Sequence, residues 1–388
     1  MNWLILAILL LARAVAATDY YVSARGSDSN PGTSRLPFRT IQRAANIVKP
    51  GDTVIVGDGT YSNPVASGSG STLLDITRSG TPGSYIIFRA QHKWRAVLDG
   101  LNNTTAEGIA ISGSYIRLQD FELTGFSDDA ISNYRGGQFI EIVGNHIHHI
   151  GRYCTDTAIG RDGIFVAHDN ITVEQNLIHD IGRYSAGENG CAPSKPYYQG
   201  NDHGIYISGA SNVVIRNNIF YNITHGWSIH VYPKPVHNLS IVSNTFAFPN
   251  PWYAGQIIIS APVTNSWIAN NIFYEPKAAA IYFNPSDRKF PKTHTISITH
   301  NISTTAMTQL HSGFFGRLVT NFQAPGIVYA SNREQTNPLL ASPSTQDFRL
   351  ASGSPAIGTG LTLPQVVNDY SGVRRANPPS VGAYEYIP

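Results

Sequence analysis

Cysteine, charge and long hydrophobic runs are all scarce in this chain, and each scarcity narrows what it can be. Of 388 residues, 2 are cysteine and 13% are Asp, Glu, Lys or Arg, with a formal net charge of +2. Such a chain lacks the basic stripe with which nucleic-acid-binding proteins meet phosphates. Beyond the N-terminus no run is apolar for long enough to cross a membrane as a helix. We therefore expect no nucleic-acid partner and no membrane-spanning domain.

The first 17 residues, MNWLILAILLLARAVAA, are the exception. They have an apolar centre and end in small residues, which is typical of a secretory signal peptide cleaved near Ala17. No Lys or Arg precedes the apolar run and Arg13 comes late, so a single N-terminal membrane anchor stays open as the alternative. We expect a signal peptide over residues 1–17 and a secreted or periplasmic mature chain, 18–388, that leaves the membrane after cleavage.

Six segments of the mature chain resemble one another. Each has an aliphatic residue three positions before an asparagine, and these asparagines are Asn145, Asn176, Asn218, Asn244, Asn271 and Asn301. A second run follows in most repeats, as in DGIFVA, HGIYIS and WSIHVY. Runs so short, β-branched and alternating predict strands rather than helices. No single repeat can bury its own apolar face, so the repeats must stack.

Stacked short strands joined by irregular turns predict an all-β, right-handed parallel β-helix that forms one domain over residues 18–388. Asparagine tolerates the left-handed bend conformation, and stacked amides can hydrogen-bond along the axis of a solenoid. The column of asparagines therefore predicts a structural ladder rather than a ligand site.

The two ends of the mature chain lack the repeat. In the N-terminal region, 18–61, the segment FRTIQRAANIVK predicts an amphipathic capping helix, whose buried face comprises Ile41, Ala44, Ala45 and Val48. Residues 310–388 are rich in Pro, Ser and Gly and predict a loop-rich C-terminal wrap.

Cys154 and Cys191 occupy two long insertions that precede DGIF and DHGIY in consecutive repeats. In an oxidising compartment they predict one disulfide that joins the insertions. Two free thiols or metal ligation stay open as alternatives, although no CxxC spacing supports zinc. The histidines of NHIHHIG, His146, His148 and His149, are interpreted as packing and turn residues, because no carboxylate follows at a zinc-like helical spacing.

A candidate site follows from aligning the second strands on their first inward aliphatic residue. Side chains alternate between faces, so the next residues point outward: Ser132, Phe165, Tyr206, His230, Ile258 and Tyr282. The residues two positions before the aliphatic ones are Asp129, Asp162, His203, Trp227, Gly255 and Ala279. Rungs stand about 4.8 Å apart. We therefore expect Tyr206 and His230 side by side, flanked by His203 and Asp162, with the insertions as walls.

The stretches YYVSARGSDSNPGTSRLPFRTIQRAA and SPAIGTGL…NDYSGVRRANPPSVGAYEY resemble the ends of secreted right-handed β-helix proteins of the pectate-lyase-like superfamily. That superfamily includes polysaccharide lyases similar to chondroitinase B, alginate lyases and family nine pectate lyases. The resemblance implies an enzyme that cleaves an acidic, uronate-containing polysaccharide by β-elimination, and it implies a Ca²⁺ cofactor.

β-Elimination needs a base, an acid and a group that neutralises the substrate carboxylate. We expect Tyr206 and His230 to form the acid/base pair, with His203 beside them. Lys234 is the alternative base, and Arg161 is expected to bind the carboxylate, as Lys234 also could.

Acidic and aromatic residues complete the expected site. Asp162 and Asp202 are the expected Ca²⁺ ligands, because Ca²⁺ takes oxygen ligands, and Asp162 is also a catalytic candidate. Asp129 is expected to contact the substrate, and Trp227 and Tyr232 to stack on sugar rings. The expected partner is a polysaccharide, bound by a monomeric protein.

Two other functions stay open. Asp129, Asp162 and His203 share one strand position on consecutive rungs, which is similar to the aspartate, aspartate, histidine column of glycoside hydrolase family twenty-eight. Neighbouring carboxylates would raise one pKa and supply the acid of a hydrolase. That family's NTDG, GHG and RIK signatures are absent. The second alternative is a non-catalytic β-helix that binds glycan.

Overall fold

The computed structural model describes residues 17–63, 68–195, 200–248, 254–284, 295–310, 319–320 and 326–388. The expected signal peptide, and the membrane anchor weighed against it, lie outside the described residues except for Ala17. Within the described ranges, no helix combines the length and apolarity needed to span a membrane.

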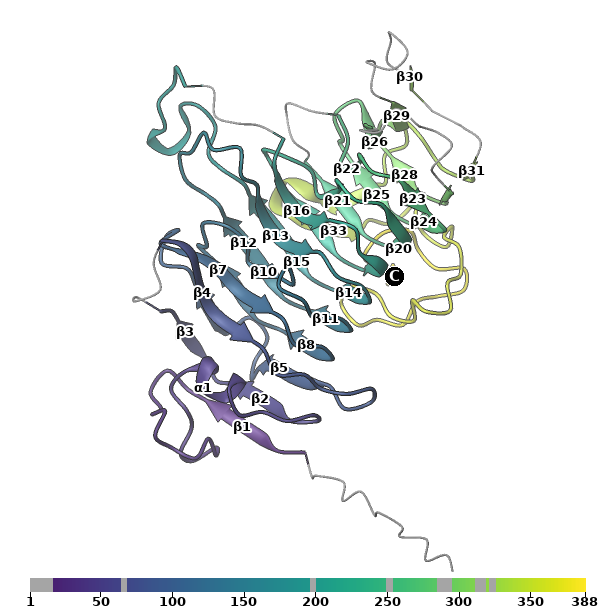
Figure 1. Ribbon diagram of the computed structural model, residues 1–388. Helices are drawn as coiled ribbons and strands as arrows, with labels where there is room; N and C mark the ends of the chain where they lie inside the picture. The colour runs from purple at the N-terminus through teal and green to yellow at the C-terminus, as the bar shows by residue number, and fades with distance from the viewer. Residues whose placement is uncertain are drawn as a thin grey trace, which may run out of the picture.

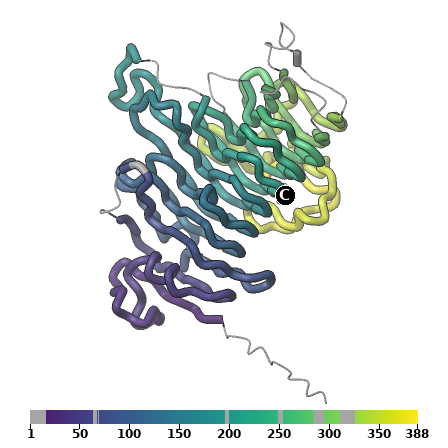
Figure 2. Tube along the Cα trace, in the orientation of Figure 1, coloured from purple at the N-terminus to yellow at the C-terminus, as the bar shows by residue number. Residues whose placement is uncertain are grey.

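The chain winds into a coil whose successive turns add one strand to each of three parallel sheets, A, B and C (Figures 1 and 2). Sheet A contains β1 (Asp19–Val22), β2 (Thr53–Val56), β5 (Ile86–Ala90), β8 (Ile116–Gln119), β11 (Ile140–Val143), β14 (Ile171–Glu174), β17 (Ser211–Arg216), β20 (Val236–Val242), β24 (Ser266–Ala269), β27 (Ile296–Thr299) and β31 (Ile327–Ala330), with β23 (Val263–Thr264) beside β20.

Sheet B contains β3 (Gly59–Tyr61), β6 (Ala96–Asp99), β9 (Glu122–Thr124), β12 (His146–Ile150), β15 (Leu177–Ile181), β18 (Ile219–Tyr221), β21 (Thr245–Ala247), β25 (Ile272–Tyr274) and β28 (Ile302–Ser303). Sheet C contains β4 (Gly68–Ile76), β7 (Thr105–Ile111), β10 (Ile131–Ser132), β13 (Arg161–Val166), β16 (Asp202–Ile207), β19 (Ile229–Val231), β22 (Ile257–Ile259), β26 (Ala279–Phe283) and β29 (Ala306–Leu310), with β30 (Val319–Thr320) antiparallel to β29.

The predicted register of sheet C is confirmed. Ile131 pairs with Ile164, Ile164 with Ile205, and the series continues through the remaining aligned isoleucines, Ile229, Ile257 and Ile281. All of them are buried in the core that fills the coil. Because the inward residues are fixed, the residues beside them must face outward on every rung.

The asparagine ladder is also confirmed, at the corner between sheets A and B. The backbone N–H of Asn145 donates to Oδ1 of Asn176 at 2.8 Å, and Asn176 donates to Asn218 at 2.9 Å. The pattern continues through the predicted residues and reaches one further asparagine: Asn244, Asn271, Asn301 and Asn332. The buried amides thus satisfy backbone N–H groups that the turns would leave unpaired.

The N-terminal segment forms a helix shorter than the pattern suggests, α1 (Ile41–Ala45). Its N-cap, Thr40, accepts a hydrogen bond from the Arg43 N–H, which satisfies an end of the helix. The predicted face is buried, and the helix packs against β1, β2 and β4. Its role as a cap of the coil stays a prediction.

The C-terminal segment, 326–388, adds β31 to sheet A and then runs beside the coil, shown in yellow in Figure 1. It includes the antiparallel pair β32 (Leu340–Ser342) and β33 (Asp347–Leu350). Phe348 packs with Tyr221 on the outer face of sheet B, in a cluster separate from the core. The proposed domain boundaries stay predictions.

Candidate active site on the outer face of sheet C

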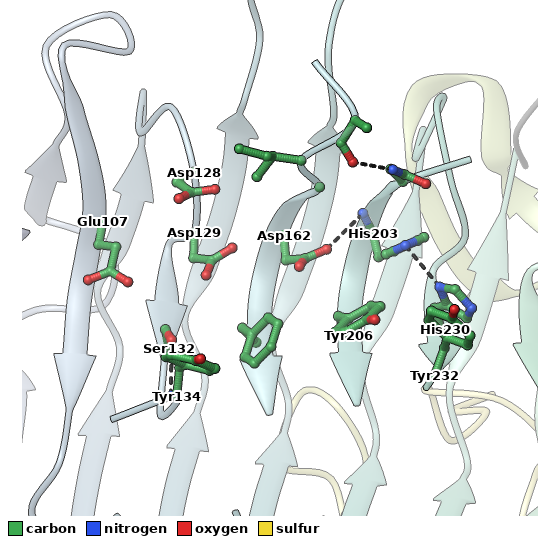
Figure 3. Close-up of a pocket in the computed structure, with 15 residues that line it drawn as sticks. Glu107, Asp128, Asp129, Ser132, Tyr134, Asp162, His203, Tyr206, His230 and Tyr232 are labelled. Carbon is green, nitrogen blue, oxygen red and sulfur yellow. Dashed lines mark hydrogen bonds between the residues drawn. The ribbon is translucent and has the colours of Figure 1, made fainter. Parts of the chain in front are cut away.

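A cavity of about 500 Å³ opens on the outer face of sheet C, across the strands from β7 to β19. Figure 3 shows two rows of side chains crossing these strands. One row contains Glu107, Asp129, Asp162 and His203, and the other contains Ser132, Tyr206 and His230. The strand register places Phe165 between Ser132 and Tyr206 in the second row. The fold therefore brings the predicted residues together: Asp129, Asp162, His203, Tyr206 and His230.

The two middle carboxyls of the first row differ from their neighbours in having no ion pair among the described residues. Glu107 is paired with Arg135 at 3.0 Å, and the neighbouring Asp128 with Arg161 at 3.0 Å. Within the described residues, neither Asp129 nor Asp162 forms an ion pair. These two carboxyls are consequently the ones left for chemistry.

Burial raises the pKa of Asp162 well above the usual carboxyl range, and the charge of Asp129 adds to the rise. Burial likewise raises the pKa of Asp129, with the charges of Asp128 and Glu107 adding to it. A carboxyl with a raised pKa is a stronger base when it is ionised and a usable acid when it is not.

Hydrogen bonds fix the protons of the histidine pair. The Trp227 backbone N–H donates to Nδ1 of His203 at 3.2 Å, so neutral His203 carries its proton on Nε2. That proton faces Nδ1 of His230 at 3.0 Å, which assigns the His230 proton to Nε2, 3.2 Å from Ser260 Oγ. Burial lowers the pKa of His230 to about 3. Neutral His230 is therefore a hydrogen-bond donor at Nε2.

Tyr206 lies between Phe165 and His230 in the second row, on the same strand as His203. Its ring centroid lies 5.3 Å from that of His230 and 5.2 Å from that of Phe165. Burial raises the pKa of Tyr206, and the nearby charge of Asp162 raises it further. The phenol therefore keeps its proton at neutral pH.

The Asp202 side chain does not lie on the face of sheet C that carries the cavity. It pairs with Arg161 in the strand register, whereas Asp162 pairs with His203, so Asp202 and Asp162 point to opposite faces. Its fully buried carboxylate accepts hydrogen bonds from the Arg183 guanidinium at 2.8 and 2.7 Å. Their placement contradicts the expectation that Asp162 and Asp202 bind the same cation.

Two expected cationic residues also lie off the pocket. The buried Arg161 guanidinium donates to Asp128 at 3.0 Å and to the Tyr153 hydroxyl at 2.7 Å, and Arg161 is absent from the pocket lining. Lys234 is exposed and does not line the cavity. Strand alternation explains the placement of Arg161, because it precedes Asp162 on β13 and so faces the other way, whereas Lys234 lies beyond the end of β19.

The two residues expected to stack on sugar rings differ in their exposure. Tyr232, 39% exposed, lines the main cavity and also a smaller neighbouring cavity of about 290 Å³ that it shares with Trp227 and His230. Trp227 is 6% exposed, and its indole N–H donates to the Ala254 carbonyl at 2.8 Å. Tyr232 therefore offers an accessible ring to the pocket, whereas the Trp227 ring is largely covered.

The two insertions form one wall of the cavity. The predicted disulfide between Cys154 and Cys191 is confirmed, with Cα atoms 5.5 Å apart. Arg183 strengthens the link, because its guanidinium donates to the Ile159 carbonyl at 2.9 Å while it pairs with Asp202. Ile159 lines the cavity. The joined loops thus hold one side of the pocket in place.

Sequence reasoning missed several lining residues. Glu107 lies two positions before Ile109, the register partner of Ile131, so extending the alignment by one rung would have found it. The others carry no such signal because loops supply them: Asp128, Tyr134, Ile159 and Asn201.

Comparison with known proteins places this geometry in a family. The model described as "Pel9A-like, right handed beta helix region" matches residues 20–253, more than half of the chain. YwoF of Bacillus subtilis (strain 168) is 27% identical over 339 residues, covering 68% of this chain and 70% of YwoF. Pectate lyase PEL9 of Emericella nidulans is 31% identical over 139 residues, covering 34% of this chain and 32% of that enzyme.

A crystal structure of pectate lyase Pel9A matches 96% of this chain and 98% of its own, with a TM-score of 0.62 and 17% sequence identity. At that identity the likeness establishes the fold, including the right-handed coil that the family model describes. The chain belongs to the Pel9A-like right-handed β-helix family.

Proposed function

We propose that this protein is a polysaccharide lyase that cleaves a uronate-containing polysaccharide by β-elimination. Its family and the pectate lyases among its relatives support this class of reaction. The observation that carries the proposal is the pocket itself, in which Asp162, Tyr206 and His230 line one cavity. Tyr206 keeps the proton that an acid must give, and His230 is neutral with a proton to donate, whereas Asp162 acts as a base in its ionised form, which its raised pKa makes more basic.

Asp162 is the proposed base and Tyr206 the proposed acid. The Asp162 carboxylate removes the proton on C5, which is α to the substrate carboxyl group. The electrons of the broken C–H bond form a C4–C5 double bond, and the bond from C4 to the glycosidic oxygen breaks. Neutral Tyr206 then gives its proton to the leaving oxygen. The raised pKa of each group suits these transfers.

His230 is the proposed donor to the negative charge that develops on the substrate carboxyl group. Its Nε2–H is fixed by His203, which acts as a positioning residue through the 3.0 Å hydrogen bond. The Nε2–H lies 3.2 Å from Ser260 Oγ, so the substrate carboxyl group would accept this hydrogen bond in place of the serine hydroxyl and be stabilised as its charge develops.

The substrate carboxylate also needs a positive partner, and the described residues that line the cavity include no Lys or Arg. We propose that Ca²⁺ takes this place. Asp129 and Glu107 fit it, because both are carboxylates on adjacent rungs that line the pocket. Oε2 of Glu107 already accepts hydrogen bonds from Arg135 and Thr72, which would leave Oε1 for the ion. When bound, the ion would neutralise the carboxylate. This arrangement replaces the pair of Asp162 and Asp202 and leaves Asp162 as the base.

Secretion belongs to the same proposal. The disulfide between Cys154 and Cys191 supports an oxidising compartment outside the cytosol. The monomeric state stays a prediction.

A screen of uronate and neutral polysaccharides tests the function. Lyase action creates unsaturated ends that absorb ultraviolet light, whereas hydrolysis creates reducing ends alone. We expect both signals on a uronate polymer and neither on a neutral one. Reducing ends without ultraviolet absorbance would overturn the lyase proposal, and binding without turnover would favour a glycan-binding protein.

A glycoside hydrolase is the second candidate, favoured by two carboxyls, Asp129 and Asp162, that form no ion pair among the described residues. With both pKa values raised, one carboxyl can serve as acid beside an ionised partner. The screen separates the two reactions. In the hydrolase, Asp129→Asn would remove activity at any Ca²⁺ concentration, whereas in the lyase added Ca²⁺ would restore part of it.

A further inference from the structure

A second group of histidines lies on the outer face of sheet B, away from the pocket on sheet C. His146 and His148 come from β12, with the inward Ile147 between them, so they share the outer face. His179 comes from β15 and is the register partner of His148. The fold thus gathers three imidazoles from two adjacent rungs, although His179 follows His146 by 33 residues.

The ring nitrogens of these histidines converge. One nitrogen from each of His146, His148 and His179 lies within 4.8 Å of the others, the one such group among the described residues. Nε2 of His146 and Nε2 of His179 are 2.7 Å apart. The rings of His148 and His179 stack with their planes 5° apart.

Carboxylates behind the imidazoles orient them. Nδ1 of His179 lies 2.6 Å from Oδ2 of Asp180 and donates its proton there, which leaves a lone pair on Nε2. Nε2 of His148 lies 3.2 Å from Oε1 of Glu122. A carboxylate that accepts a hydrogen bond from one ring nitrogen while the other nitrogen keeps a lone pair, as at His179, is typical of the outer shell of metal-binding histidines. On His148 the other nitrogen, Nδ1, lies 2.7 Å from Nδ1 of His149, and this contact would give way if Nδ1 bound the ion.

Aromatic rings hold the group in place. The Trp94 ring centroid lies 4.8 Å from that of His146, and Tyr221 stacks on His179 at 4.4 Å. Tyr221 is itself packed against Phe348 of the C-terminal segment. The imidazoles are therefore oriented before any ligand arrives, which reduces the entropy lost on binding.

We propose that His146, His148 and His179 form a zinc site. Neutral imidazole is a preferred ligand of Zn²⁺, and three histidines with one open position are a known zinc arrangement. Ligand nitrogens about 2.0–2.1 Å from a tetrahedral ion stand roughly 3.3 Å apart. The contact between His146 and His179 must therefore open by about 0.6 Å, within the reach of side-chain rotation. The bound ion would tie β12 to β15.

Calorimetry with Zn²⁺ tests the proposal. The secreted chain, made without a polyhistidine tag and freed of metal with a chelator, is titrated with zinc chloride. We expect one zinc ion per chain at micromolar affinity or better. His148→Ala and His179→Ala should each weaken binding by more than about 100-fold, because loss of a ligand exceeds the roughly 10–100-fold loss expected for Asp180→Asn. His237→Ala removes an exposed histidine of sheet A, paired with Thr264, and should bind like the parent chain.

Co²⁺ spectroscopy and a conservative variant keep the proposal testable if the alanine variants fail to fold. Co²⁺ in place of zinc should give the intense visible absorption of a tetrahedral nitrogen site in the parent chain and in His237→Ala. His146→Gln, at a half-buried position, should lose it while keeping the circular dichroism of the fold. The absence of stoichiometric zinc binding, or its persistence in folded His148→Ala and His146→Gln, would overturn the site. These outcomes do not depend on lyase activity.

Discussion

The two histidine groups on this coil differ in their hydrogen-bond partners more than in their burial. Burial lowers the pKa of His230 on sheet C to about 3, and of His148 and His146 on sheet B to about 3 and about 4. On sheet C a backbone N–H begins a chain that sets the proton on Nε2 of His230. On sheet B, Asp180 accepts a hydrogen bond from Nδ1–H of His179, which leaves a lone pair on Nε2 of His179, the nitrogen that faces His146. The first arrangement suits a hydrogen-bond donor and the second a metal ligand.

Removing the acid of the sheet C pocket should have the largest effect. Tyr206→Phe should lower kcat by about 10²–10⁴-fold, because it deletes the proton that the leaving oxygen receives. Turnover is measured from the absorbance of unsaturated products. Tyr282→Phe removes the same atom from the same outward column of sheet C, outside the cavity, and should turn over normally. Equal loss in both variants would contradict the role given to Tyr206.

His230→Gln should lower kcat by about 10²–10³-fold, the usual cost of losing an oriented donor to developing charge. The loss should fall on kcat more than on KM, because the hydrogen bond strengthens as the charge develops. His203→Gln should act in the same direction with a smaller effect. If His230→Gln raised KM alone, its role would be substrate binding.

Acid should destabilise the fold through the buried histidines. His230 has a folded pKa near 3 and an ordinary value of 6.5, so between these pH values the unfolded chain binds more protons. The contribution of His230 to the free energy of unfolding is fully present above pH 6.5 and is lost as the pH falls toward 3. One pKa unit corresponds to about 1.4 kcal/mol. We expect a Tm that falls below pH 6.5, with a shallower slope in His230→Gln. An unchanged slope would contradict this linkage.

Asp129 provides a matched comparison of opposite sign. Its folded pKa is raised, so its protonated form is favoured in the folded chain and stability is lost as the pH rises through that pKa. Asp129→Asn should therefore raise the Tm at neutral pH when Ca²⁺ is absent, whereas His230→Gln should matter mainly in acid. A lower neutral Tm in Asp129→Asn would show that its carboxylate is satisfied in the folded chain.

Removing the disulfide tests directly whether the two faces are independent. Replacing Cys154 and Cys191 with serine frees a loop closed over 37 residues, which should lower stability by about 3–4 kcal/mol. The loops border the cavity on sheet C, so KM should rise. Zinc affinity on sheet B should not change, because the histidine group has no contact with these loops among the described interactions. Loss of zinc binding would mean that the two faces are coupled.

Most of the sheet C site could be predicted from the sequence, because strand alternation fixes both the inward isoleucines and the residues beside them. The same rule did not reveal that Asp202 is committed to Arg183, since that partner comes from an insertion with no repeat. The loop residue Asp128 was missed for the same reason. The alternation of side chains along a strand cannot predict partners that come from loops.

The histidines of sheet B show a second limit of prediction from the sequence. From the sequence alone, NHIHHIG favours packing, because no carboxylate follows the histidines at the zinc spacing of a helix. In a coil, the third ligand lies a full turn away, and the length of the intervening loop hides the spacing. The interpretation of His146 and His148 as packing residues is incomplete, since both also face a shared centre with His179.

The asparagine ladder makes whole turns of the coil interchangeable. Each rung bonds to the rungs directly above and below it through the same amide geometry, so deleting or duplicating one complete turn would rejoin the ladder without a mismatch. The reacting groups would not be so tolerant. Loss of the turn that bears Asp162 would bring Asp129 beside His203, and the protein could acquire a new arrangement of acids from a single in-frame event.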